Sequence, residues 1–508
     1  MKTICLVISL LSFFIYRPYV IQRSGMIYEG DDRQYLAHAT SLAFGQFPSY
    51  TLEGNTSPAF AYSWGPGLLA APFVWLFSWL DRWDGNPIVL NRGLGDVKTS
   101  WAAFGFVMAT QFYFLLGILF LFLAVSHTGS HSEAAILFIS VASAGVLLYV
   151  YRRPVFAHIY EFCSVSFAIW LLCQVLPLSG LQNSSLSLGW MVLASFSIYL
   201  TRYNNLPVAY AFLYSFVMAK AGYKPTQVTK VIQDRRISVK LFLMTFIFAA
   251  LVYSVHILGS RAVVDEKILP VISRKTTMLF LLTNRGIRFY IERTVHILFG
   301  LDWGLLYTAP LALIGLAGYW RWPGTAYFAA PLLALVVNLY ICLCWGTQAS
   351  WYGYRYLLFA LLPLSTLGMA LFLNQKVVDN RRWFYALAML AILSLIPAFL
   401  FEGNSTTLTL HNAEEGWINN QYLVMVWKTV MTHPQDAMII LLKGGPLYLV
   451  YLFAAAFGKT AMLPAEVLVR YPVFELKVVF KSVLIWIFPS VFAWLSAPWI
   501  KRSMETSS

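Results

Sequence analysis

Charged side chains are scarce in this chain of 508 residues, because 11% are Asp, Glu, Lys or Arg, whereas a soluble globular protein carries about a quarter. Hydrophobic residues make up 59% of the sequence. So few charges among so many apolar residues exclude an ordinary soluble domain. The composition indicates an integral membrane protein.

The sequence also lacks a dominant series of short alternating segments separated by turn signals. Many apolar runs instead approach the roughly 20 residues that a helix needs to cross about 30 Å of hydrocarbon. The chain is therefore predicted to be an all-α integral membrane protein with about twelve transmembrane helices. Hydropathy places these spans at residues 3–20, 101–125, 134–151, 157–177, 186–203, 205–220, 240–259, 305–320, 325–344, 354–373, 383–401 and 476–499.

Cysteine is rare as well, and none of the five cysteines has the spacing of a zinc site or a redox pair. The net charge of +14 would suggest nucleic acid in a soluble protein. In a membrane protein, orientation and contact with anionic lipid explain such a charge more simply. Nucleic acid is therefore excluded as a partner, and membrane lipids are expected.

Residues 63–83 decide the topology. They are apolar enough to cross a membrane, but they begin with Gly and Pro and are rich in Trp and Phe, as interfacial helices are. The loop at residues 220–240 holds six Lys and Arg against one Asp, and such loops stay in the cytoplasm. It does so only if residues 63–83 lie on the outer surface, so we predict a juxtamembrane helix there.

With this topology, ionisable residues gather on the outer side and are scarce in the middle of the spans, which argues against a polar pathway through the bilayer. Asp31 and Asp32 follow the first span. The loop at residues 261–302 breaks the charge rule, which is most plausible where function needs positive charge. The other candidates on this side are Arg153, His158, Glu161, Arg202, Arg288 and Arg355.

Carboxylates and arginines at a lipid boundary suit one reaction in particular. A carboxylate can accept the proton of a hydroxyl that attacks a sugar's anomeric carbon, while cations hold a phosphate that leaves as an anion. A glycosidase instead uses two carboxylates, because its leaving alcohol must be protonated. Nucleotide sugars are not readily available outside the bacterial membrane, so a lipid phosphate is the expected carrier.

Two segments carry a resemblance to a known superfamily. "DDRQY" contains Asp31, Asp32 and Tyr35, and "SPAFAYSWGPGLLAAPF" predicts a surface helix with a Pro-containing start. This order resembles the GT-C superfamily of polytopic glycosyltransferases, which includes the lipid A aminoarabinose transferases and the protein O-mannosyltransferases. In these proteins the first span leads to an outer loop with a pattern like Asp-Glu-x-x-Tyr, followed by a surface helix.

The resemblance covers residues 1–400 and departs from the superfamily in two places. Asp32 replaces the usual Glu. His158 and Glu161 stand in the neighbourhood where relatives of the aminoarabinose enzyme tend to have Asp. The tail matches no known family, and its apolar segment at residues 437–458 suggests a re-entrant or interfacial hairpin, or two further spans.

The resemblance implies a GT-C-like catalytic module at residues 1–401 and a C-terminal region at residues 402–508 with interfacial segments and a final span. It implies an inverting glycosyltransferase at the periplasmic face of the bacterial inner membrane, with Asp31 as general base. The donor would be a polyprenyl-phosphate-linked sugar, and the acceptor a lipid, a glycan or a protein. The expected substrate-binding residues are Tyr35, Arg153, His158, Glu161, Arg202, Arg288 and Arg355.

Each site residue also has a plainer interpretation. Asp31 could cap a helix rather than act as a base, and Asp31 with Asp32 could bind Mg²⁺ or Mn²⁺, as some superfamily members do. Arg355 could contact a lipid headgroup rather than a substrate phosphate. Because Glu161 follows His158 by one helical turn, the two could form a buried pair.

Two other classes of function compete with the enzyme. A transporter or lipid flippase should show ionisable residues in the middle of its spans and matched interrupted segments in two halves, and the sequence shows neither. A membrane scaffold that shares the fold but lacks catalysis is the third class, because fold does not determine function.

The topology predicts that residues 31 and 230 lie on opposite sides of the membrane. We expect an impermeant maleimide to label Asp31→Cys in intact spheroplasts, and to label Lys230→Cys only after permeabilisation, on a background without the five native cysteines. Labelling of both positions from the same side would contradict the topology.

Overall fold

The computed structural model describes residues 1–19, 31–45, 63–88, 99–126, 132–142, 144–152, 154, 157–176, 188–224, 227, 233–261, 287–301, 304–322, 324–344, 355–374, 381–400, 422–472 and 474–505. Within these ranges the regular structure is entirely helical, and no strand occurs. The prediction of an all-α chain is confirmed for this part of the protein.

The helices have the following bounds. They are α1 (Lys2–Ile15), α3 (Asp31–Ala43), α4 (Gly65–Trp83), α6 (Trp101–Ser126), α7 (Ser132–Ala142), α8 (Ala144–Tyr151), α9 (His158–Val175), α10 (Leu188–Thr201), η3 (Tyr203–Asn205), α11 (Leu206–Lys220), α13 (Arg235–Arg261), α15 (Ile287–Phe299), α16 (Leu305–Thr308), α17 (Pro310–Leu316), η4 (Ala317–Arg321), α18 (Thr325–Cys344), α19 (Arg355–Asn374), α20 (Arg381–Leu400), α21 (Tyr422–Thr432), α22 (Pro434–Leu442), α23 (Gly445–Ala456), η7 (Thr460–Met462), α24 (Ala465–Arg470) and α25 (Leu476–Glu505).

Among the described residues, six helices are long and apolar enough to cross a membrane, or seven if the bent pair α22 and α23 is one span. These helices support a multi-pass membrane protein. The six stretches are Trp101–Ser126, His158–Val175, Arg235–Ser254, Leu357–Asn374, Arg382–Leu400 and Leu476–Lys501. Every predicted span overlaps a helix, but several are short or broken, so twelve crossings remain a prediction. Helix α4, at residues 65–83, does not pass the same test.

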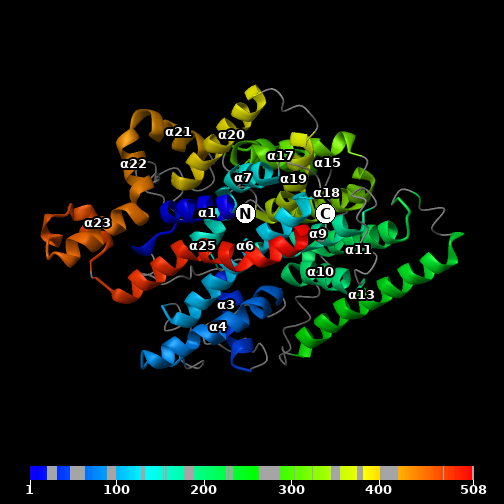
Figure 1. Ribbon diagram of the computed structural model, residues 1–508, viewed down its shortest axis with the longest axis horizontal. Helices are drawn as coiled ribbons and strands as arrows, with labels where there is room; N and C mark the ends of the chain where they lie inside the picture. Colours follow the sequence, from blue (N-terminus) through cyan, green and yellow to red (C-terminus); the bar gives the residue numbers. More distant parts are fainter. Residues whose placement is uncertain are drawn as a thin grey trace.

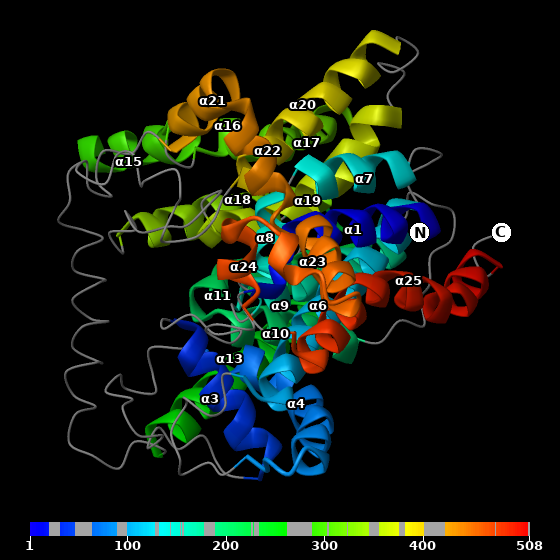
Figure 2. The ribbon, with the colours of Figure 1, turned by 90° about the vertical axis from the view of Figure 1, so that its left-hand side faces the viewer.

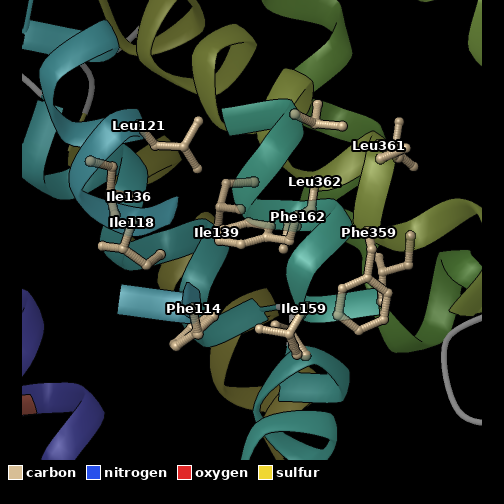
Figure 3. Packing of buried hydrophobic residues seen from close by; sticks show 14 of the residues in the cluster. Phe114, Ile118, Leu121, Ile136, Ile139, Ile159, Phe162, Phe359, Leu361 and Leu362 are labelled. Atoms are coloured by element: carbon tan, nitrogen blue, oxygen red, sulfur yellow. The ribbon is translucent and has the colours of Figure 1, made fainter. Parts of the chain in front are cut away.

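The core of the bundle is built around α6. Its 26 residues are apolar on all sides, which is typical of a helix buried on all sides, and it packs against α4 and α9. Helix α19 covers α9 from another direction. Figure 3 shows how Phe114 of α6, Ile139 of α7, Phe162 of α9 and Phe359 of α19 contribute to the same cluster of buried side chains.

The first and last helices lie side by side. Helix α25 packs against α1 and also contacts α6, and Figures 1 and 2 show both termini on the same side of the bundle. At that end the amino group of Met1 forms an ion pair with Glu133 at the start of α7. The C-terminal region therefore belongs to the same packed body as the first helix, and the proposed division at residue 401 stays a prediction.

A buried corner joins α4 to α6. The carboxylate of Asp81 accepts hydrogen bonds from the backbone N–H groups of Trp101 (2.8 Å) and Ala102 (2.9 Å), which satisfies amides at a helix start. Burial raises the pKa of Asp81, and these two bonds oppose the shift. Asp84 pairs with Lys477 at 2.7 Å, and this hydrogen bond lowers the pKa of the Asp84 carboxyl.

The opposite end of α1 is closed by the C-terminal helices, as Figure 1 shows. Helices α22 and α23 meet at an angle of 66°. Arg17 donates to the carbonyl of Ile440 at 3.0 Å, and Arg152 donates to the carbonyls of Ile15 (2.9 Å) and Phe399 (2.8 Å). These guanidinium groups satisfy the last carbonyls of three helices. Residues 437–458, expected to form a re-entrant or interfacial hairpin or two further spans, belong to a bent helix pair that is either one broken span or a re-entrant loop.

Close backbone contacts fix the start of α4 between α3 and α10. The hydroxyl of Ser63 donates to the carbonyl of Thr201 at 2.5 Å. A Cβ on Gly65 would lie 2.6 Å from the carbonyl carbon and oxygen of Leu200, and one on Gly67 would lie 2.4 Å from the Cβ of His38. Burial lowers the pKa of His38 to about 4, against a hydrogen bond to the Ser63 backbone, so this imidazole is neutral at physiological pH.

We expect Gly65→Ala to destabilise the protein. The obstacle is the backbone of Leu200, so the strain of about 1–3 kcal/mol should exceed the roughly 1 kcal/mol that Ala gains over Gly in a helix. Thermal unfolding in detergent measures the change, and the exposed Leu68 on the same helix gives the control Leu68→Ala. An unchanged or higher melting temperature for Gly65→Ala would contradict the close contact.

Candidate functional site

A buried carboxylate lies at the centre of the candidate site. Glu161, in the first turn of α9, is fully buried. Its Oε1 accepts a hydrogen bond from Nδ2 of Asn205 at 2.7 Å, and its Oε2 accepts one from Nη1 of Arg202 at 3.3 Å. Because an isolated buried charge is very costly, this pairing is what allows an ionised Glu161 inside the bundle.

His158 lies beside this ion pair. Its Nδ1 is 3.2 Å from Nη1 of Arg202 and 3.5 Å from Oε2 of Glu161. Its ring stacks on Phe359, with the ring centroids 5.1 Å apart and the planes inclined by 22°. The imidazole is therefore held by Arg202, which follows α10, and by Phe359 of α19.

Two further amides continue the network toward α18. Nδ2 of Asn338 donates to Oδ1 of Asn205 at 2.6 Å, and Nδ2 of Asn204 donates to Oδ1 of Asn338 at 3.0 Å. Asn338 and Asn205 are fully buried. We call the set of His158, Glu161, Arg202, Asn204, Asn205 and Asn338 the polar network.

The local sequence explains how these side chains converge. Helix α10 ends at Thr201, and Arg202 then takes an extended conformation (φ −156°, ψ 117°) before the short turn of η3. Pro207 stands in the first turn of α11, where a missing N–H costs nothing. This sharp turn places Arg202 and Asn205 on either side of the Glu161 carboxylate. The three-residue spacing of His158 and Glu161 puts both on one face of α9.

The structure brings together three of the predicted site residues, namely His158, Glu161 and Arg202. Tyr35 is buried in an apolar cluster with Leu36 and Tyr160, and Tyr160 directly precedes Glu161 in α9. Arg288 is 90% exposed on α15 and pairs with Glu292 at 2.6 Å, so no contact joins it to the network.

The remaining predicted residues lie partly or wholly outside the part of the chain that the structure describes. Helix α3 begins at Asp31, so Asp31 and Asp32 occupy its first turn, but their side chains are outside the described residues. Arg355 is the first residue of α19, and its side chain also lies outside the described part of the structure. Arg153 is outside altogether. The roles predicted for these four residues stay predictions.

The positions of the helix starts are nevertheless informative. Phe359, which stacks on His158, is one turn after Arg355. On the other side, Thr201 precedes Arg202 and contacts the start of α4, which in turn packs against α3. The polar network therefore lies between the start of α19 and the α3–α4 pair that carries Asp31.

Sequence reasoning missed the contribution of Asn204, Asn205 and Asn338. Asn338 had a usable signal, because it is a strongly polar side chain inside an apolar span, and such residues are rare and usually functional or paired. Asn204 and Asn205 follow Arg202 by two and three residues, but in this segment the sequence analysis assigned a role to Arg202 alone. Their contacts depend on the meeting of α11 and α18, which no single-sequence pattern shows.

The proposed metal site is not tested by these residues. Among the described residues, no group of three or more His, Cys, Asp or Glu side chains could hold a metal ion. The site expected for Mg²⁺ or Mn²⁺ rests on Asp31 and Asp32, whose side chains are outside the description.

The carboxylate of the network can position groups but is poorly suited to accept a proton from a substrate. Both oxygens of Glu161 are engaged by Asn205 and Arg202, and it is the one carboxylate among the described members of the cluster. The base that the sequence predicts, Asp31, lies outside the network at the start of α3.

No protein-family model and no curated protein sequence matches the chain. Among solved structures, it is similar to the crystal structure of the oligosaccharyltransferase from Archaeoglobus fulgidus in its apo form, with a TM-score of 0.39 and 14% sequence identity. The match covers 84% of this chain and 55% of the other, so the chain spans about half the length of that enzyme. At this TM-score the likeness supports no conclusion about fold or function.

We expect Arg202→Met to destabilise the protein by about 3–5 kcal/mol, because it leaves Glu161 as an uncompensated buried charge. Adding Glu161→Gln should restore part of the loss, since the double variant removes both charges. The matched control is Arg288→Met, which breaks an exposed pair and should cost roughly 0.5 kcal/mol or less. Strictly additive effects of Arg202→Met and Glu161→Gln on thermal unfolding would show that the two side chains are not coupled.

Proposed function

We propose that this protein is a glycosyltransferase that moves a sugar from a polyprenyl-phosphate donor to a lipid, glycan or protein acceptor. The reaction would take place at the periplasmic face of the bacterial inner membrane. The single observation that supports it best is the buried, hydrogen-bonded ion pair of Glu161 and Arg202, placed between the start of α19 and the α3–α4 pair. Buried ionisable groups inside a helical membrane protein are expensive and usually serve function.

In the proposed reaction, the carboxylate of Asp31 accepts the proton of the acceptor hydroxyl. The hydroxyl oxygen forms a bond to the anomeric carbon from the face opposite the phosphate. The bond between the anomeric carbon and the phosphate oxygen breaks, and the electron pair leaves with the lipid phosphate. Attack from the opposite face inverts the configuration at the anomeric carbon.

Guanidinium groups would stabilise the charge that develops on the phosphate. Arg355, at the start of α19, is one turn from the residue that stacks on His158 and is the first candidate for this contact. Arg202 is the second, held in place by Glu161. His158, beside Arg202, would contribute a hydrogen bond to the sugar or to its phosphate.

The bent pair α22 and α23 is a feature that transporters also show, since discontinuous helices often line their binding sites. Here its break is closed by contacts with α1. A Cβ on Gly444 would lie 2.6 Å from the carbonyl oxygen of Phe14, and Arg17 donates to the carbonyl of Ile440. The pair therefore packs against the end of a neighbouring helix, and we favour the enzyme over a transporter or flippase.

We expect Asp31→Asn to lower transfer by about 100-fold or more, because it removes the general base, while the melting temperature stays unchanged. The probes are undecaprenyl-phosphate esters of glucose, mannose, galactose and aminoarabinose, incubated in nanodiscs with a membrane extract as the source of acceptor. Mass spectrometry measures the undecaprenyl phosphate that is released.

The matched control is Asp84→Asn, which changes a carboxylate that pairs with Lys477 at the start of α25. This variant should turn over like the wild type. Wild-type turnover in Asp31→Asn would remove Asp31 from the mechanism. Failure of the wild type to release undecaprenyl phosphate from any of the four donors would contradict the proposed function.

A further inference from the structure

We infer that the amide chain Asn204–Asn338–Asn205 positions Glu161, and through it Arg202, so that the guanidinium group binds the phosphate of the lipid carrier. This inference rests on the proposed function and names residues that the sequence analysis did not assign. Asn338 is the key member, because it reaches the site from α18, which contributes no other predicted residue.

The direction of the hydrogen bonds supports this role. Asn204 donates to Asn338, Asn338 donates to Asn205, and Asn205 donates to Glu161. Asn338 and Asn205 therefore each present an oxygen to the preceding donor and an N–H to the next acceptor, and the sequence of bonds ends on a carboxylate. Such aligned bonds polarise one another in a low-dielectric interior. The chain favours an ionised Glu161 with its second oxygen turned toward Arg202.

The turn that carries Arg202 is held from three directions. Ser63 donates to the carbonyl of Thr201, Glu161 accepts from Arg202, and Asn338 donates to Asn205. Buried polar side chains from three different parts of the chain thus serve to fix one short segment. A tight geometry of this kind is what a group needs when it must meet a leaving phosphate.

A structural role alone is the competing explanation, because amide side chains commonly hydrogen-bond across helices in membrane proteins. The two explanations differ in one respect. Interhelical adhesion needs a polar contact, whereas positioning of Glu161 needs the correct direction of each bond. A substitution that keeps the size of Asn338 and removes its donor separates them.

Asn338→Asp is that substitution. In its ionised form the introduced carboxylate accepts from Asn204 but donates nothing to Asn205, so Asn205 must turn its N–H toward that carboxylate and its oxygen toward Glu161. We expect this variant to bind undecaprenyl phosphate in nanodiscs about 10-fold or more weakly than the wild type at about pH 8. Turnover of the donor that the wild type uses should fall in parallel.

Acid should reverse the defect. Burial next to Glu161 favours the neutral form of the introduced carboxylic acid, which can donate to Asn205 again, so at about pH 5.5 the affinity should return to within roughly 3-fold of the wild type. Among the described residues, the titratable or charged side chains of the polar network beside the three amides are Glu161, His158 and Arg202. They are present in both proteins, as is the phosphate, so the ratio of variant to wild-type affinity at each pH reports the effect of the introduced carboxylate, including its effect on their titration.

Val336→Ala, at an exposed position of α18, is the matched control and should bind like the wild type at both pH values. If Asn338→Asp does not fold, Asn338→Ala gives the same loss of affinity at about pH 8 without acid recovery. Variants with a lower melting temperature that bind undecaprenyl phosphate normally would show that the amide chain has a structural role alone. That result would overturn the inference.

The binding arm also separates this inference from the proposed function. The wild type could bind undecaprenyl phosphate, with the variants in the expected order, and yet transfer no sugar. That result would support the positioning role of the amide chain and contradict the proposed transfer reaction. If the wild type transfers sugar and Asn338→Asp equals it at about pH 8, the inference falls alone. A wild type that binds no undecaprenyl phosphate overturns the inference as well.

Discussion

The buried ion pair of Glu161 and Arg202 is the constraint on which the rest of the candidate site depends. A carboxylate inside an apolar bundle is tolerated only when it is paired with a cation and hydrogen-bonded. That requirement ties α9 to the turn after α10 and, through the asparagines, to α18. The same requirement fixes where His158 can lie, since its Nδ1 faces both members of the pair. The same contacts therefore fix the positions of these side chains and stabilise the charge on Glu161.

The surrounding helices hold this arrangement by close backbone contacts and by polar groups at the helix ends. Gly65 and Gly67 allow the start of α4 to approach the backbones of α10 and α3, and Asp81 anchors the other end of α4 to the first amides of α6. At the end of α1, Arg17 and Arg152 satisfy helix carbonyls and join the C-terminal helices to the bundle. These contacts hold the α3–α4 pair, which includes the helix that begins at Asp31, against the turn that carries Arg202.

Much of the fold could be predicted from the sequence, because the length and hydropathy of apolar runs follow directly from the thickness of a membrane. The helix at residues 65–83, the helix that begins at Asp31 and the pairing of His158 with Glu161 each had a local signal, either a composition or a three- to four-residue spacing. The contact between Asn205 and Asn338 had no local signal in the sequence, because residues 133 apart in the chain meet only after α11 and α18 pack. Arg288 was predicted from the positive charge of its loop, but its helix leaves it exposed and paired with Glu292.

The central claim is that the polar network forms one wall of a site for a lipid phosphate. The most direct measurement is an electron cryomicroscopy structure of the protein in nanodiscs containing undecaprenyl phosphate. We expect density for the phosphate within hydrogen-bond distance of Arg202 or Arg355, with the carboxylates at the start of α3 facing the phosphate. Phosphate density at another end of the bundle, with the network closed and fully packed, would contradict it.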